Sequence, residues 1–453
     1  MPMPDNALLL DLYELTMAQA YFYYKPRAMA TFDLFVRKLP PGRNYLIACG
    51  LSDILAYLKN LRFSKEDLQY LGSLKLFSPD FLRYLAAFKF RGDVWAMPEG
   101  TIFFAQEPVI RVTSAIIEAQ IIESFLLNTV NLQTMIASKA SRIVSSAAGR
   151  PVFDFSLRRT HGSEAGIKVA RSSYIAGFSG TATVEAGKLY GIPVIGTMAH
   201  SFVMSFEREI ESFFAYSRVF PDKSTFLVDT YEVKKGIANA VAAGLYLKEK
   251  GYLLRGIRLD SGDIVYWSRL ARRALDSRGL RKVGIVATGN LDEFKIKKLL
   301  QKGAPIDSFG VGTNMGVSID APCLDVVYKL SEVSGEAGRF LPTMKLSCGK
   351  ATYPGRKQVF RIRSKTSGYS RDILALESEP LRGEPLLRKA VAGGRVIYPR
   401  ESLERIRRRA ASQLAYFSPR LKTIDCRYRY PLIISGGLTK TMRSLARQLC
   451  RKQ

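Results

Sequence analysis

The sequence has few of the residues on which disulfide-linked and metal-bound proteins depend. Its 453 residues include five cysteines and two histidines. The cysteines are odd in number, widely scattered and form no C-x-x-C pair, so neither a disulfide framework nor a zinc knuckle is indicated. A reducing compartment is the simpler interpretation. These cysteines are Cys49, Cys323, Cys348, Cys426 and Cys450.

Long apolar runs are missing as well. Near the N-terminus, the apolar residues 8–10 are followed at once by Asp11 and then Glu14, unlike the apolar stretch of a signal peptide. The longest uncharged stretch, 189–206, is interrupted by glycines and a proline, whereas a membrane-spanning helix needs an unbroken apolar run. We therefore expect a cytoplasmic protein with no membrane partner.

Acidic residues are scarce relative to basic ones. The chain has 40 Asp and Glu residues and 68 Lys and Arg residues, which gives a formal net charge of +28. Such an excess fits nucleic acid, an anionic membrane or anionic substrates. Four arginines gather at 405–409, but no aromatic residues interleave with them as in a single-strand-binding groove. Small anionic substrates are therefore favoured, and a basic nucleic-acid-binding protein is the remote alternative.

The length indicates two or three domains. Residues 1–135 are expected to form a mixed α+β domain, with helices over 8–24, 51–60, 79–88 and 116–127 and strands over 28–37, 94–97 and 101–104. A further helix is expected over 132–148. After residue 350 the pattern is irregular, and the tail 351–453 is expected to pack on the N-terminal domain.

Between 136 and 350, short apolar strands alternate with amphipathic helices. The expected strands are 152–155, 193–195, 225–229, 256–260, 283–287 and 306–310, and the expected helices include 163–175, 234–250, 264–277 and 291–301. This alternation predicts a parallel sheet. An open sheet and a closed barrel share it, but polar residues follow the C-terminal end of each strand, which favours an α/β barrel.

Two carboxylates, Asp260 and Asp263, follow the strand 256–260. Their spacing suits a ribose diol or a hydrated Mg²⁺, and the alternative is that Asp260 or Ser261 simply caps the next helix. Arg258 lies two residues earlier, on the same side of the strand as Asp260. An arginine there is costly unless it meets an anion.

Two successive Gly-rich turns follow the next two strands. The first is 287–290 and the second is 310–314. Small residues let backbone N–H groups approach a phosphate, although plain capping turns have the same composition. Arg158 and Arg159 follow another strand and suit a pyrophosphate or a carboxylate, the alternative being surface ion pairs.

His200 is the residue to which the sequence draws most attention. A lone histidine in an apolar run is usually a buried core residue. Small residues flank it, however, and it follows the expected strand 193–195. An imidazole in a loop of that kind can accept a phosphoryl group as well as a proton. With no second histidine or cysteine nearby, no metal site is expected.

Together these segments resemble the nicotinate phosphoribosyltransferases, a family of type II phosphoribosyltransferases. The matching stretches, in the family's order, are 10–17, 155–159, 196–202, 228–231, 257–263, 287–290 and 309–313. The resemblance implies an irregular α/β barrel with an α+β domain formed by the N-terminal segment and the C-terminal tail. It also implies the coupling of nicotinate to 5-phosphoribosyl 1-diphosphate, driven by ATP and requiring Mg²⁺, as the first step of NAD synthesis from nicotinate.

The resemblance assigns roles to particular residues. His200 matches the family's phosphorylated histidine, and Asp260 and Asp263 are expected beside it as catalytic carboxylates. Nicotinate-binding positions match Tyr13, Thr197 and Arg258. The expected phosphoribosyl and diphosphate contacts are Arg158, Arg159, Gly289, Asn290, Gly310, Gly312 and Thr313.

In the family's usual homodimer, Tyr13 would act across the interface, in the site of the partner subunit. The resemblance gives no role to His161 or to the arginines at 405–409. Nicotinamide- and quinolinate-specific relatives share the barrel and are the nearest alternatives. A cation facing a substrate carboxylate favours the acid.

Overall fold

The computed structural model describes residues 7–335, 338–347, 352–364 and 368–451. Within them the chain forms two compact units, one from 1–135 together with 323–453 and the other from 136–322. The division falls inside helix α6 (Glu123–Ser146). Residues 323–335 and 338–347, which we assigned from the sequence to the barrel domain, cluster with the first unit because strand β12 (Val326–Ser334) pairs along β1 (Met29–Val36).

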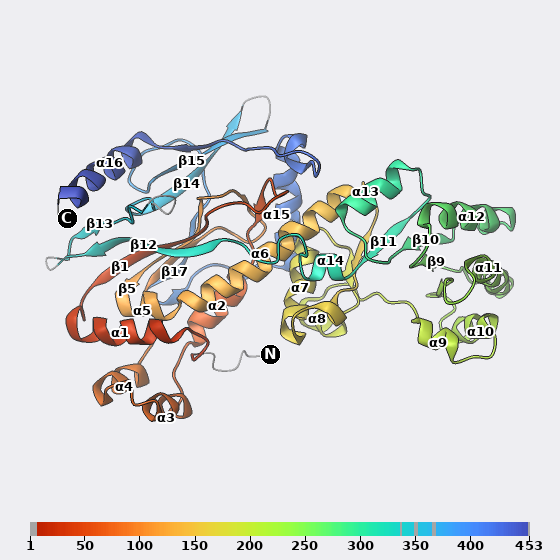
Figure 1. Ribbon diagram of the computed structural model, residues 1–453, viewed down its shortest axis with the longest axis horizontal. Helices are drawn as coiled ribbons and strands as arrows, with labels where there is room; N and C mark the ends of the chain where they lie inside the picture. The colour runs from red at the N-terminus through yellow and green to blue at the C-terminus, as the bar shows by residue number, and fades with distance from the viewer. Residues whose placement is uncertain (1–6, 336–337, 348–351, 365–367, 452–453) are drawn as a thin grey trace. The chain divides into compact units, whose positions relative to one another are not determined.

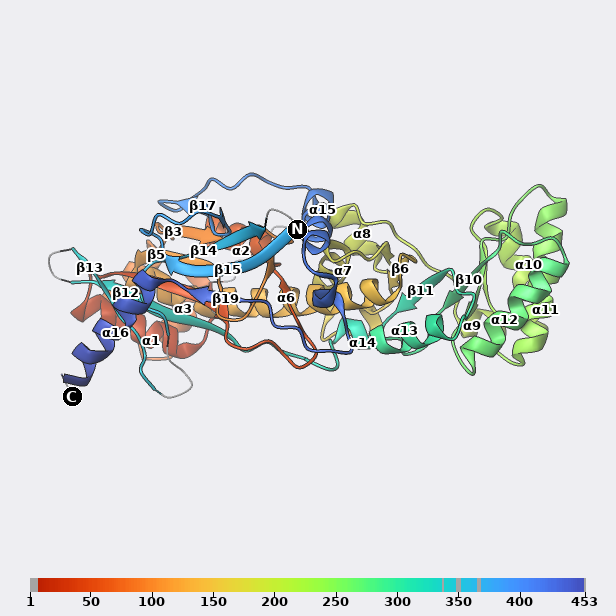
Figure 2. The same cartoon turned by 90° about the horizontal axis from the view of Figure 1, so that it is seen from above.

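The strands of the first unit pair in antiparallel fashion except for β15 and β19, which are parallel. A seven-stranded sheet has the order β13-β12-β1-β5-β3-β17-β18, and a four-stranded sheet has the order β16-β14-β15-β19. Figure 2 shows β14, β15 and β19 side by side. The remaining bounds are β3 (Asp93–Ala96), β5 (Pro108–Ala115), β13 (Phe340–Pro342), β14 (Lys357–Ser364), β15 (Gly368–Leu376), β16 (Glu384–Pro385), β17 (Arg388–Ala392), β18 (Arg395–Val396) and β19 (Leu432–Ile434), with a small pair of strands β2 (Leu46–Ile47) and β4 (Ile102–Phe103).

Helices flank these sheets. Those of the first unit are α1 (Leu12–Tyr24), α2 (Leu51–Asn60), α3 (Lys65–Ser73), α4 (Pro79–Ala86), α5 (Ile116–Ile121), α15 (Leu403–Tyr416) and α16 (Gly436–Arg451). The helix expected over 51–60 is confirmed. The break expected near residues 128–131 is wrong. The chain leaves the helix at Ile122 and then continues as α6, whose sequence contains no glycine or proline to interrupt its hydrogen bonds.

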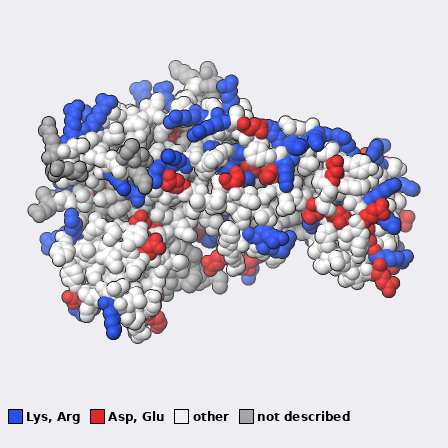
Figure 3. Space-filling view, in the orientation of Figure 1, with Lys and Arg blue, Asp and Glu red and all other residues white. Residues whose placement is uncertain are grey.

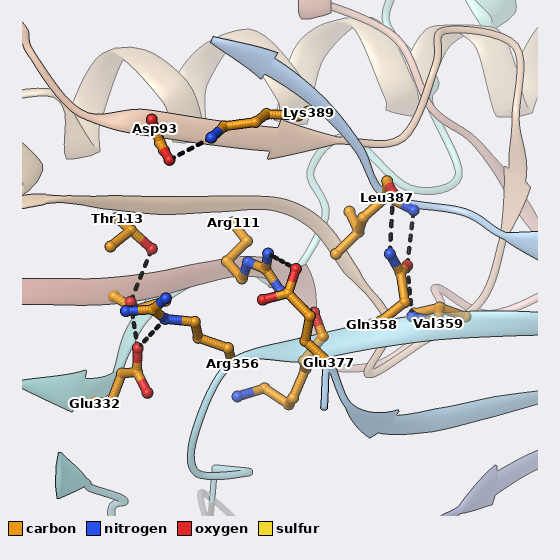
Figure 4. Close-up of polar contacts among 12 residues, drawn as sticks. Asp93, Arg111, Thr113, Glu332, Arg356, Gln358, Val359, Glu377, Leu387 and Lys389 are labelled. Atoms are coloured by element: carbon orange, nitrogen blue, oxygen red, sulfur yellow. Dashed lines mark hydrogen bonds and ion pairs between the residues drawn. The ribbon is translucent and has the colours of Figure 1, made fainter. Parts of the chain in front are cut away.

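Polar side chains tie the sheets of the first unit together (Figure 4). Arg111 on β5 is buried and donates to Glu377 at 2.6 Å and to the backbone oxygen of Lys357 at 2.7 Å. The side-chain amide of Gln358 on β14 donates to the backbone oxygen of Leu387 at 3.0 Å, and its side-chain oxygen accepts from the backbone N–H of Leu387 at 2.9 Å. Buried polar groups need such partners, because an unpaired one costs about 1–3 kcal/mol.

The second unit is an α/β fold around one parallel sheet, ordered β7-β6-β11-β10-β9-β8. Its strands are β6 (Val152–Asp154), β7 (Gly180–Thr181), β8 (Thr225–Leu227), β9 (Gly256–Leu259), β10 (Gly284–Ala287) and β11 (Ser308–Val311). Its helices are α7 (Ser163–Ile175), α8 (Val184–Tyr190), α9 (His200–Met204), α10 (Glu209–Val219), α11 (Val233–Glu249), α12 (Ile264–Ser277), α13 (Glu293–Gln301) and α14 (Thr313–Gly316), with a 3₁₀ turn η1 (Leu157–Arg159) (Figure 1).

The expected βα alternation is confirmed in this unit, and the helices expected over 163–175 and 264–277 have the predicted bounds. The strand expected over 193–195 is reduced to a single parallel bridge between Val194 and Thr181, since Pro193 has no N–H to donate. Helices α10, α11 and α12 bury apolar faces on β8, β9 and β10, where the rings of Phe213 and Phe226 stack 4.6 Å apart.

Within the described residues, no helix combines the length and apolar character that crossing a membrane requires. On the face drawn in Figure 3, Lys and Arg side chains are spread over the surface and lie beside Asp and Glu in several places.

Candidate active site

Polar turns follow the strands of the parallel sheet. Because the strands are parallel, these turns all lie at the carboxyl ends of the strands, on the same side of the sheet. The turns after β6, β8, β9, β10 and β11 begin at residues 155, 228, 260, 288 and 312. The segment 196–200 follows the bridge at Val194, which is parallel to β7. The sheet therefore gathers polar turns that begin between residues 155 and 312 of the sequence.

Arg258 holds the centre of this edge. Its Nε donates to Thr288 Oγ1 at 3.0 Å, and one terminal nitrogen donates to Thr197 Oγ1 at 3.0 Å and to Met198 O at 3.4 Å. Its other terminal nitrogen forms an ion pair with Asp260 at 2.8 Å. The guanidinium also lies 5.8 Å from the Phe155 ring. Four of its five N–H groups are thus used, and one remains for a ligand.

The anion that we expected for Arg258 is present in the protein itself, as Asp260. Asp260 also accepts a hydrogen bond from Thr288 Oγ1. Burial works to raise the pKa of this carboxyl, but the bonds from Arg258 and Thr288 outweigh it and the pKa is lowered. The charge of His200 lowers it slightly further. Asp260 is therefore ionised at neutral pH.

Asp263 has a different role from Asp260. Its carboxylate caps α12, accepting from the backbone N–H of Tyr266 at 3.1 Å, and the residue is exposed. The sequence suggested Asp260 or Ser261 as the residue that caps this helix, but Asp263 caps it. The structure therefore shows one carboxylate of the pair in the Arg258 cluster and the other at a helix start.

His200 is half-buried at the start of α9, and its Nδ1 lies 3.1 Å from Thr230 Oγ1. Thr230 comes from the turn after β8, directly beside Asp229. One oxygen of Asp229 accepts from Asp260 N at 3.1 Å and from Ser261 Oγ at 2.5 Å, while its other oxygen is buried and accepts nothing from the described residues. The turns after β8 and β9 and the His200 loop are thus held together.

The two Gly-rich turns are also joined. Asn314 donates its side-chain amide to Asn290 O at 2.9 Å and to Leu291 O at 3.2 Å. Gly312 precedes α14 and Thr313 begins it. Gly310 carries no side chain because a Cβ there would lie 2.6 Å from the Phe155 ring.

Arg158 and Arg159 lie on the exposed 3₁₀ turn after β6. Within the described residues, neither guanidinium makes a hydrogen bond or ion pair. The turn itself is fixed by buried Asp154, which accepts from Ser156 and from Thr181. His161 is exposed in the loop that follows.

Thr288, Asp229 and Thr230 were not among our candidates, although each lies at a strand end. Their position after an apolar strand is the signal that would have identified them. Among the described residues, no group of three or more His, Cys, Asp or Glu side chains is arranged to hold a metal ion.

Tyr13 belongs to the first unit, on α1, where it is 46% exposed. Burial raises the pKa of its hydroxyl, and the negative charges of Glu123, Glu14 and Asp11 raise it further. The adjacent Glu14 is fully buried. One of its carboxylate oxygens accepts from Ser124 N and Oγ, and the other accepts no hydrogen bond from the described residues. Burial raises the pKa of Glu14 to about 8.

Two family models match the chain. The N-terminal domain model of nicotinate phosphoribosyltransferase matches residues 8–131, and the model of the nicotinate phosphoribosyltransferase family matches 151–338. The chain belongs to the nicotinate phosphoribosyltransferase family. The family that the sequence motifs predicted is thereby confirmed.

Relatives agree over most of the chain. Nicotinate phosphoribosyltransferase pncB2 of Mycobacterium tuberculosis is 46% identical over 435 residues, covering 96% of this chain and 92% of the relative. The nicotinate phosphoribosyltransferase of Bacillus subtilis is 40% identical, covering 85% of this chain and 79% of the relative. The crystal structure of human nicotinic acid phosphoribosyltransferase is 30% identical, with a TM-score of 0.86 over 96% of this chain and 99% of that one.

Gly289 provides a test of how the site is held. Its φ is +90°, and a Cβ there would lie 1.9 Å from the carbonyl oxygen of Asp260. We expect Gly289→Ala to lower the free energy of unfolding by about 2–4 kcal/mol, because backbone strain and overlap add. Gly196→Ala, whose Cβ would meet nothing within 4 Å, should cost less than about 1 kcal/mol. Urea unfolding of both variants measures this, and equal losses would contradict it.

Glu14 gives a pH prediction for the first unit. A carboxyl whose pKa is about 8 in the folded state and ordinary in the unfolded state stabilises the fold below about pH 4.5 and loses that contribution as the pH rises through 8. The free energy of unfolding should fall over this range, and Glu14→Gln should reduce the slope by up to about 1 kcal/mol per pH unit. Urea titrations at several pH values measure it. An unchanged slope in Glu14→Gln would refute the assignment.

Proposed function

We propose that the chain joins nicotinate to 5-phosphoribosyl 1-diphosphate, releasing diphosphate and forming nicotinate mononucleotide, with ATP hydrolysed to ADP and phosphate. The observation that carries the proposal is the Arg258 cluster at the carboxyl edge of the sheet, level with two Gly-rich turns and His200. The proposed reaction is the first step of NAD synthesis from nicotinate, and it would take place in the cytoplasm.

The chemistry requires charge stabilisation more than proton transfer. When diphosphate leaves C1 of the ribose, the ribose becomes positively charged and the leaving group negative. Ionised Asp260 supports a positive ribose. The backbone N–H groups of the turns at 288–290 and 312–314, with Arg158 and Arg159, suit the phosphate groups. Nicotinate attacks through its ring nitrogen, whose lone pair needs no base.

Nicotinate binding is assigned to Arg258, Thr197 and Tyr13. The remaining N–H of Arg258 suits the carboxylate of nicotinate, and Thr197 holds the guanidinium in position. Since nicotinamide has no carboxylate, this arrangement favours the acid. Tyr13 lies in the other unit, and it is proposed to complete the site of a partner subunit in a homodimer.

His200 is proposed to couple ATP to the reaction. Its Nδ1 faces Thr230, so Nε2 is the ring nitrogen left to accept the phosphoryl group. The N–P bond forms as the bond between the γ-phosphorus and its bridging oxygen breaks, ADP leaves, and water later hydrolyses the phosphohistidine. The energy released is available to hold the site in its binding state.

Mg²⁺ fits the donor set because Asp229 has a buried carboxylate oxygen without a partner and Asp260 is ionised. These two residues would hold it, and the ion would neutralise charge on the diphosphate.

The parallel sheet is proposed to close into an irregular barrel. In support, one cavity of about 360 Å³ is lined by residues beside both outer strands, Val194–Thr197 next to β7 and Asp222–Thr225 at β8. Side chains of β6, β10 and β11 line it as well. A flat sheet would keep its two edges apart.

The histidine assignment predicts the fate of labelled phosphate. With ATP labelled at the γ-position, His200→Ala should form no acid-labile phosphoprotein while retaining slow, uncoupled nucleotide synthesis. The chain offers one other histidine as a control, and His161→Ala should label like wild type. Acid-labile label persisting on His200→Ala would show that the acceptor is a different residue.

Arg258 predicts a selective loss of substrate affinity. Arg258→Ala should raise the nicotinate KM by at least about tenfold while changing the KM of the phosphoribosyl donor far less, because a charge-assisted bond of roughly 1.5–3 kcal/mol is lost. Arg281→Ala removes an exposed arginine before β10 and should change neither constant. Steady-state kinetics with each substrate varied in turn measures both. An unchanged nicotinate KM would remove Arg258 from the nicotinate site.

A further inference from the structure

The first unit contains a polar pocket that the reaction does not use. Its volume is about 200 Å³, and it lies among β14, β15, β16, the start of β17, helix α15 and the turn 98–101. Three arginines line it, Arg363, Arg388 and Arg409, together with one acidic residue, Glu384. Arg409 belongs to the group of arginines at 405–409 that the family resemblance left unexplained.

Two of these arginines are held in place by neighbours. Arg409 pairs with Glu401 and donates to the backbone oxygen of Glu99 at 2.6 Å. Arg363 lies over the rings of Tyr369 and Tyr416, at 5.4 and 5.3 Å, and only 3.4 Å from Glu384. Their guanidinium groups are therefore positioned before any ligand arrives, which lowers the entropy cost of binding.

Arg388 is different, because its guanidinium makes no hydrogen bond or ion pair with any described residue, although it lines the same pocket. The three arginines therefore give the lining more positive charge than the carboxylate of Glu384 balances. An anion is the ligand that would restore the balance.

Buried polar groups line the pocket as well. Thr101 is 2% exposed and Gln413 is 8% exposed. The Gln413 side-chain oxygen accepts from Ile102 N and from Arg361, while its amide nitrogen donates to no described residue. The Thr101 hydroxyl is likewise without a described partner. Both residues line the pocket, so each group is available to a ligand there.

We propose that this pocket binds a phosphate group, with Arg363 and Arg388 as its charged contacts and Thr101 and Gln413 as its neutral donors. The volume suits a phosphate rather than a whole nucleotide, because pockets for drug-sized ligands measure about 300–1,000 Å³. Orthophosphate and the terminal phosphate of a nucleotide share this chemistry. The pocket lies wholly in the first unit, and the proposal does not depend on the proposed reaction.

Calorimetric titration of the full chain with orthophosphate tests the site. Phosphate held by the proposed active site is present in every variant and cancels in the comparison. Wild type should bind one more phosphate per chain than Arg388→Glu. Arg408→Glu, which makes the same charge change on the exposed side of α15, should keep the wild-type stoichiometry. Equal stoichiometry in wild type and Arg388→Glu would overturn the proposal.

A second variant separates a built site from general positive charge. Thr101→Val keeps the shape and the backbone bonds of Thr101 but removes the hydroxyl, and it should weaken the Arg388-dependent binding several-fold. Unchanged affinity would mean that surface charge alone attracts the anion, and would overturn the site. Circular dichroism melting checks that each variant is folded. Competition by ADP for the same site would identify a nucleotide phosphate as the ligand, and binding of orthophosphate alone would identify the free ion.

Discussion

The hydrogen bonds of Arg258 are the interaction on which the candidate active site depends. This one guanidinium reaches the turn after β10 through Thr288, the His200 loop through Thr197, and the turn of its own strand through Asp260. Burying a cation is costly unless its donors are used, so the turns must close around it. Asp229 then extends the network to the turn after β8. The parallel strands place the turns at one end of the sheet, and Arg258 connects three of them.

The same network explains why the pairing of Arg258 with Asp260 is compatible with substrate binding. The pair keeps Asp260 ionised and Arg258 oriented before a ligand arrives, which is the pre-organisation that charge-stabilising catalysis requires. An incoming carboxylate needs only the remaining N–H of Arg258.

Much of this site could be predicted from the sequence because its residues follow apolar strands. The positions of Asp260 and Gly289 at strand ends were readable from the βα alternation, and the family was readable from the motifs. His200 instead begins α9, after a single bridge at Val194. The helix cap formed by Asp263 was not distinguishable from catalysis, since both place a carboxylate after a strand. Thr288 and Thr230 also follow apolar strands, but the contacts that give them a role are made with His200 and Arg258, which are about 30 residues away in the sequence. The pairing of β12 with β1 joins residues about 300 apart, and no local pattern encodes it.

The account's central claim is that this chain selects nicotinate through a cation and couples its use to ATP. Product analysis with the phosphoribosyl donor and Mg²⁺, supplied with nicotinate or nicotinamide and with or without ATP, tests that claim most directly. We expect nicotinate mononucleotide as the main product, with about one ADP formed per nucleotide when ATP is present and a lower yield without it. A preference for nicotinamide, or nucleotide formation indifferent to ATP, would contradict the account.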